Sequence, residues 1–284
     1  MLLGMLAAAP PFFIRSSDGS AMLATAESLV QRGDLAIDDR YLGDVPLKPS
    51  ARRGPDGRAY AKYGIGWPLV LAGVLAAATA VGVTPGSPAM TWVLVTVNPL
   101  VSALTAVLAL AMARELGAGR RWALALAIGG SLTTFAWTSG TFDHADPLLT
   151  VLMTGAFWCT LRFARTQARR DAAVAGLLLG AVILTKSSLV VMAPGIVAGL
   201  VVSAWHARRR HVPPRTGTRG ATPSVATVIA PLWPLLACAP GVLGGIGAQF
   251  WLNEVRWGSP WTSGYNEPVL TGDLGIGLWQ LTVG

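Results

Sequence analysis

Long stretches without a charged residue constrain this chain more than any other feature. Segment 90–113 carries no charge, and about 17–25 apolar residues suffice to cross a bilayer. The chain is 52% hydrophobic and only 13% charged, whereas soluble domains carry about 25% charged residues. Further apolar segments are 1–14, 122–138, 147–161, 172–185, 189–205 and 225–252. The sequence therefore predicts an all-α membrane protein, a polytopic helix bundle of about seven spans.

Basic residues concentrate between the apolar segments. Segments 114–121, 162–171 and 206–219 together hold twelve arginines and only two acids. Lys and Arg are enriched in cytoplasmic loops, so all three segments are predicted to be cytoplasmic. Short basic loops explain the net charge of +8 without a nucleic-acid partner, which would need a basic patch or stripe on one face. The segments predicted to lie outside are 15–62, 139–146, the turn at Lys186, and 253–284.

Whether the apolar segment 67–83 crosses the membrane decides the predicted side of every later loop. If it crossed the membrane, and segment 1–14 crossed from an inside N-terminus, every later loop would be inverted. We therefore expect 67–83 to lie at the outer interface, within a first outer loop that runs over 15–88. An N-terminus on the outside is the alternative.

The outer loop is predicted to carry a short amphipathic helix over 20–31, ended by Gly33. Its apolar face comprises Met22, Leu23, Ala26, Leu29 and Val30. Such a helix would lie in the plane of the interface. On the cytoplasmic side, 207–224 is rich in Pro, Arg, Gly and Thr and is predicted to be a basic, disordered linker.

Ionisable side chains at the predicted outer ends of the apolar segments are candidates for function, because a charge near hydrocarbon is costly. Asp18 follows the first segment and Asp146 precedes a later one. Each has a structural alternative as a helix cap. Lys62 could instead be an interfacial anchor, and Lys186 could cap the carbonyls of the preceding helix. His144 has no spaced partner for a metal site, so no metal ligands are predicted.

Five short motifs follow one another at predicted outer positions. They are SSDGSAM around Asp18, YAKYGIGWP from Tyr60, GTFDHADPL around Asp146, LTKSS around Lys186, and NEVRWGSP from Asn253, followed by Gly264 and Tyr265. In this order they resemble the N-terminal portion of the multi-spanning C-class glycosyltransferases that use polyprenyl-phosphate-linked sugars. That family includes protein O-mannosyltransferases and lipid A aminoarabinose transferases.

The resemblance implies an enzyme that moves a sugar from a polyprenyl-phosphate donor to a hydroxyl of a lipid or protein acceptor. It would work at the outer face of the bacterial inner membrane, among membrane lipids, with inversion at the sugar. The implied catalytic residues are Asp18, as general base, and Asp146. The implied substrate-binding residues are Lys62, Lys186, Tyr60, Asp143, Arg256 and Tyr265. No cofactor is certain, and a divalent cation stays open.

Two departures from the family pattern stand out. Asp18 is followed by Gly19, where the family usually has a second acid, and the chain ends at Gly284, where family members continue. We therefore expect 1–284 to be the N-terminal part of one transmembrane glycosyltransferase domain, truncated at its C-terminus. A polytopic transporter or lipid flippase is the alternative from another class, and an inactive fragment is the third. Transporters place charges near the midplane and often have two similar halves, whereas these acids lie in outer loops.

Overall fold

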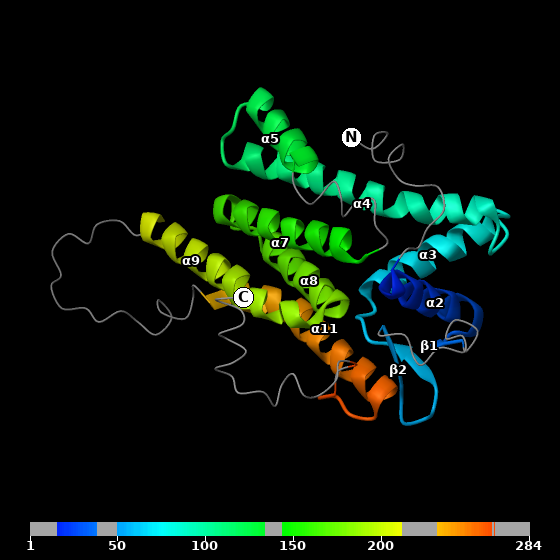
Figure 1. Ribbon diagram of the computed structural model, residues 1–284. Helices are drawn as coiled ribbons and strands as arrows, with labels where there is room; N and C mark the ends of the chain where they lie inside the picture. Colours follow the sequence, from blue (N-terminus) through cyan, green and yellow to red (C-terminus); the bar gives the residue numbers. More distant parts are fainter. Residues whose placement is uncertain (1–15, 39–49, 134–143, 212–231, 263, 265–284) are drawn as a thin grey trace, which may run out of the picture.

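The computed structural model of the protein describes residues 16–38, 50–133, 144–211, 232–262 and 264. Most of these residues are helical, and α8 (Arg169–Thr185) is the central helix (Figure 1). It packs between α7 (Asp146–Thr166) and α11 (Trp233–Trp257). The core of the bundle is thus built around a helix of only 17 residues.

Four further helices surround these three. The long helix α4 (Pro88–Glu115) packs against α7 and carries α5 (Arg120–Thr133). After α8 the chain forms the 3₁₀ helix η2 (Ser187–Met192) and then α9 (Ala193–His211), which packs against α7 and α11. Because α9 continues to His211, residues 207–211 of the predicted linker are helical. Residues 212–224 lie outside the described part of the chain.

Four of the described helices are long and apolar enough to cross a membrane. They are α4, α7, α11, and η2 continued by α9 as far as Arg208. α4 has the highest mean hydropathy, at 2.1. The prediction of a mostly helical chain with several candidate spans is confirmed, but only four of about seven predicted spans are supported. α5 has 14 residues and α8 has 17, and segment 1–14 lies outside the described residues.

Glycines let α8 and α11 approach each other closely. Gly176 and Gly180 on α8 face Gly241 and Gly245 on α11, and a Cβ added to any of the four would collide with the backbone of the facing helix. Small residues at the contact are the usual means of close helix packing in membranes. The α8–α11 pair therefore depends on the absence of side chains at these positions.

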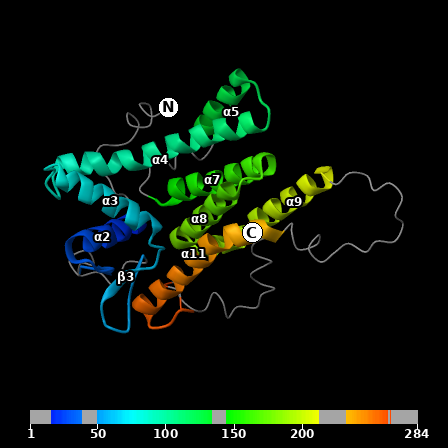
Figure 2. The same ribbon diagram turned by 180° about the vertical axis from the view of Figure 1, so that it is seen from behind.

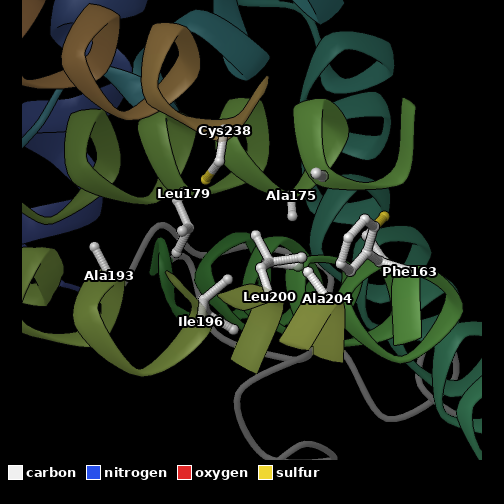
Figure 3. Packing of buried hydrophobic residues seen from close by; sticks show 11 residues of the cluster. Phe163, Ala175, Leu179, Ala193, Ile196, Leu200, Ala204 and Cys238 are labelled. Carbon is white, nitrogen blue, oxygen red and sulfur yellow. The ribbon is translucent and has the colours of Figure 1, made fainter. Parts of the chain in front are cut away.

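Larger apolar side chains fill the space beside this contact (Figure 3). Phe163, Leu179, Ile196 and Leu200 are almost fully buried in one cluster that joins α7, α8 and α9. Cys238 of α11 belongs to the same cluster as a buried free thiol. It therefore behaves as a small apolar residue.

The arginine-rich segments meet at one end of the bundle. The α4–α5 turn, the α7–α8 turn and the C-terminal end of α9 lie together, at the left in Figure 1 and at the right in Figure 2. Arg165 donates a hydrogen bond to Glu115 at 2.8 Å, and Arg162 lies 3.7 Å from Asp171. The three segments, which were predicted from their charge to share one side, therefore lie at one end of the bundle. We call this end the basic end.

The other end carries α2 (Ser17–Arg32), α3 (Gly66–Ala80) and a small antiparallel sheet. The strands are β1 (Ala36–Ile37), β2 (Ala51–Arg53) and β3 (Ala59–Ala61), in the order β1-β3-β2. This sheet was not predicted from the sequence, because strands of two or three residues are too short to show an alternating pattern. α3 and the first half of α4 extend beyond α7 and α8, away from the basic end (Figures 1 and 2).

The helix predicted over 20–31 is α2, and it ends at Gly33, whose φ is +69°. The predicted apolar face is only partly buried in the protein. Met22 and Ala26 pack in a cluster with α3, α4 and α7, but Val30 is 41% exposed. The second buried face consists of small residues such as Ala24, which packs against the sheet. α2 thus lies between α3 and the sheet. Small residues such as Ala24, which were not part of the predicted apolar face, are therefore buried.

Candidate functional site

Residues 60–66 lie against the C-terminal end of α8. A Cβ at Gly64 would collide with the carbonyl oxygens of Leu184 and Thr185, and a Cβ at Gly66 would collide with the Thr185 side chain. Glycine is the residue that permits such close backbone approach. These contacts bring the segment that contains Lys62 to the turn at Lys186, although the two lysines are far apart in the sequence.

The C-terminal end of α11 joins the same place. Arg256 is only 2% exposed, and its Nη1 donates a hydrogen bond to the Tyr63 carbonyl at 2.8 Å. A Cβ at Gly264 would lie 2.7 Å from Lys62 Cα and 2.8 Å from the Trp257 ring. Three of the motifs that the sequence analysis singled out, around Lys62, Lys186 and Arg256, therefore meet in space.

The Arg256 guanidinium is incompletely paired. Its Nε and Nη2 are buried without a hydrogen-bond partner in the structure. Unsatisfied buried donors cost about 1–3 kcal/mol, and more when the group is charged. The two unpaired nitrogens carry three N–H donors, which can bind an acceptor such as a phosphate or carboxylate oxygen.

Lys62 lies in the segment that contacts Arg256, one residue before Tyr63. Lys186 lies at the end of α8 that the same segment contacts. Lys62 is half-buried and Lys186 is exposed, and neither ammonium group has an ion-pair or hydrogen-bond partner among the described residues. The backbone N–H of Lys186 donates to the Val182 carbonyl and closes α8. The Lys186 backbone therefore satisfies a carbonyl at the end of α8. The Lys186 side chain makes no hydrogen bond to the described residues of α8 and can bind another group.

Asp18 does not cap α2. The cap is Ser16, whose Oγ accepts a hydrogen bond from the Gly19 amide at 2.8 Å. Asp18 lies in the first turn, half-buried, and accepts a hydrogen bond from Ser17 Oγ at 3.2 Å. A carboxylate in the first turn is still favoured by the helix dipole, but the alternative that Asp18 serves as the N-cap is wrong.

Asp146 does not act as a side-chain cap either. It is the first residue of α7, and the N-cap position belongs to Ala145 without a side-chain hydrogen bond. The two helices that begin near these acids share one hydrophobic cluster, which contains Met22 of α2 and Leu148 of α7. The first turns of α2 and α7, which carry Asp18 and Asp146, therefore lie at the end opposite to the arginine-rich turns (Figure 1).

Tyr60 holds the β2–β3 hairpin to α11. Its ring packs edge-on against Trp257 at 6.0 Å between centroids, and its hydroxyl donates to Asp56 at 2.6 Å. Burial and this hydrogen bond raise the pKa of Tyr60 to about 12, and the same bond lowers the pKa of Asp56. Tyr60 thus stays neutral at physiological pH, with its hydroxyl engaged inside the hairpin.

Two predicted site residues, Asp143 and Tyr265, lie outside the described residues. Next to the first of them, the His144 carbonyl accepts a hydrogen bond from Asn98 at 3.1 Å. Within the part of the chain that the structure describes, no three His, Cys, Asp or Glu side chains gather as a metal site. Two further polar residues beside the site, Ser50 and Arg52, were not predicted from the sequence, because only strand pairing brings them there.

Comparison with known proteins yields a family match. No curated protein and no solved structure matches the chain. Residues 68–233, more than half of the chain, match the family described as dolichyl-phosphate-mannose-protein mannosyltransferase. The matched range includes Asp146 and Lys186, whereas Asp18, Lys62 and Arg256 lie outside it. The chain therefore belongs to this family of membrane glycosyltransferases, which use lipid-phosphate-linked sugars as donors.

Proposed function

We propose that the chain moves a sugar from a polyprenyl-phosphate donor to an acceptor hydroxyl at the outer face of the cell membrane. The observation that carries the proposal is the buried Arg256 guanidinium with two unpaired nitrogens. It lies at the place where the Lys62 segment and the Lys186 turn meet. Three cations at one end of a membrane helix bundle suit the phosphate of a lipid-linked sugar.

The reaction needs a base and a stabilised leaving group. The acceptor oxygen attacks the anomeric carbon as the bond from that carbon to the phosphate oxygen breaks, with inversion. In the proposed mechanism Asp18 takes the acceptor proton. The electron pair of the broken bond stays on the polyprenyl phosphate, whose negative charge Arg256, Lys62 and Lys186 stabilise. Asp146, the first residue of α7, would orient the acceptor, which is a lipid or a protein, or bind a divalent cation.

Donor binding tests the role of the cations. Lys186→Gln and Arg256→Gln should each weaken binding of polyprenyl phosphate in nanodiscs, because each removes hydrogen bonds to a charged group. Such bonds contribute about 1.5–3 kcal/mol, so the dissociation constant should rise about 10- to 100-fold. Arg120→Gln, at the basic end, is the matched control and should bind normally.

Lys186 makes the test robust, since its side chain is exposed and its loss should not affect folding. Normal binding by both Lys186→Gln and Arg256→Gln would rule out the proposed phosphate site. A thermal unfolding curve for each variant shows whether Arg256→Gln remains folded.

The topology is a second proposal: the segment from Arg15 to Pro88 lies outside and α3 does not cross the membrane. In support, α3 begins beside the Lys186 turn and packs against the first half of α4.

Single cysteines at the exposed Pro55 and Pro85 should both react with an impermeant thiol reagent in intact cells. Leu116→Cys, which replaces a 70% exposed residue at the basic end, should react only after lysis. Protection of one of the two outer positions would contradict this topology.

A further inference from the structure

The pairing of β2 with β3 decides which side chains share a face of the small sheet. Arg52 lies opposite Tyr60, and the Lys62 amide donates to the Ser50 carbonyl at 3.1 Å, which continues the same register. Directly opposite residues of an antiparallel pair lie on the same face. Ser50 and Arg52 therefore share the face of Tyr60 and Lys62, whereas Ala51 between them points the other way, into the cluster with α2.

This face packs toward the end of α11. The Tyr60 ring contacts Trp257, and a Cβ at Gly54, where the hairpin turns, would collide with the Arg256 carbonyl. Lys62, opposite Ser50, lies against Gly264 and is thereby close to Trp257 as well. The face of the sheet that carries Ser50 and Arg52 is therefore continuous with the cation group of Lys62 and Arg256.

Polar atoms on this face are buried without partners. Ser50 is 1% exposed, and its hydroxyl makes no hydrogen bond in the structure. Arg52 Nη1 is also buried without a hydrogen-bond partner. The neighbouring strand residue offers a contrast, because Arg53 is exposed and its Nη1 donates to the Gly57 carbonyl at 2.7 Å. Ser50 and Arg52 thus place unpaired buried donors on the face of the sheet that packs toward the end of α11, where Arg256 also has two unpaired nitrogens. These donors indicate a common acceptor.

We propose that Ser50 and Arg52 bind the phosphate of the lipid donor, alongside Lys62 and Arg256. This inference rests on the proposed function. A guanidinium and a hydroxyl are both hydrogen-bond donors suited to phosphate oxygens. The donor phosphodiester carries one negative charge, and the released polyprenyl phosphate carries up to two. Arg52 therefore acts most strongly as the bond to the sugar breaks, because the electron pair then remains on the phosphate.

The test compares two adjacent arginines. Arg52→Gln should raise the dissociation constant for polyprenyl phosphate in nanodiscs at least about 10-fold, and should lower the transfer rate. Ser50→Ala should cause a smaller loss of affinity. Arg53→Gln should leave polyprenyl phosphate binding unchanged. Polyprenol, which has the same lipid tail and no phosphate, should bind equally to all variants.

The outcomes separate this inference from the proposed function. Normal phosphate binding by Arg52→Gln, together with weakened binding by Lys186→Gln, would overturn the role of Arg52 and leave the proposed function intact. Equal binding of polyprenol and polyprenyl phosphate by the unmodified protein would overturn both. Arg52→Lys keeps the charge and should retain part of the phosphate affinity. If Arg52→Lys lost polyprenol binding as well, Arg52 would serve folding rather than phosphate binding, and the proposal would be wrong.

Discussion

Replacing Asp18 with asparagine should lower the rate of sugar transfer by about 10²–10⁴, the usual effect of losing a general base. Asparagine has nearly the same size as aspartate but cannot accept the proton of the acceptor hydroxyl. The helix should remain intact, because Ser16 and not Asp18 caps α2. Single-turnover transfer from a saturating polyprenyl-phosphate-linked sugar measures this step apart from donor binding.

Ser16→Ala is the matched control for Asp18→Asn. It removes the cap of α2 and should lower the stability by about 0.5–2 kcal/mol, while the transfer rate of the folded protein stays within a few-fold of normal. If Asp18→Asn transferred sugar at the normal rate, Asp18 would not be the base. If Ser16→Ala lost as much activity as Asp18→Asn, the effect would come from the placement of α2 and not from proton transfer.

Gly241→Ala should destabilise the bundle strongly. The new methyl group would collide with the backbone of Gly176 and Leu177, so α8 and α11 would have to move apart. Overpacking of this kind costs about 1–3 kcal/mol or more, and backbone cannot rotate away as a side chain can. The melting temperature in detergent should fall clearly, with loss of the α8–α11 contact that positions Lys186 and Arg256 together.

Gly244→Ala provides the control for this change. Gly244 is in the same helix, is exposed, and has nothing within 4 Å of an added Cβ. Alanine is preferred over glycine inside a helix by roughly 0.5–1 kcal/mol, so Gly244→Ala should leave the melting temperature unchanged or raise it. A Gly241→Ala protein as stable as the Gly244→Ala protein would show that the close contact between α8 and α11 does not hold the bundle.

The candidate site was partly predictable because its charged residues are conspicuous in an apolar chain. A lysine or aspartate at the end of an apolar run is costly, so Lys62, Lys186, Asp18 and Asp146 stood out without a structure. Ser50 and Arg52 did not, since their segment contains several arginines of similar appearance. Arg52 differs from Arg53 only in the face of the strand on which it lies.

Helix capping also separates what residue type indicates from what only the backbone decides. Asp18 and Asp146 were reasonable caps by residue type, but the first helical residue depends on where the backbone turns into the helix. For α2 that point is two residues before Asp18, at Ser16. Helix ends are set by local backbone geometry that composition does not specify.

By itself the sequence determined that this chain is a helical membrane protein, in which the arginine-rich turns are grouped apart from the candidate site residues. Hydrophobic runs and the excess of arginine act locally, one segment at a time, and can be read without neighbours. The tertiary structure decided which glycines lie in the α8–α11 contact, which face of α2 is buried, and which arginines meet at the site. Those properties depend on pairs of segments far apart in the chain, such as Tyr63 with Arg256, and no local pattern encodes them.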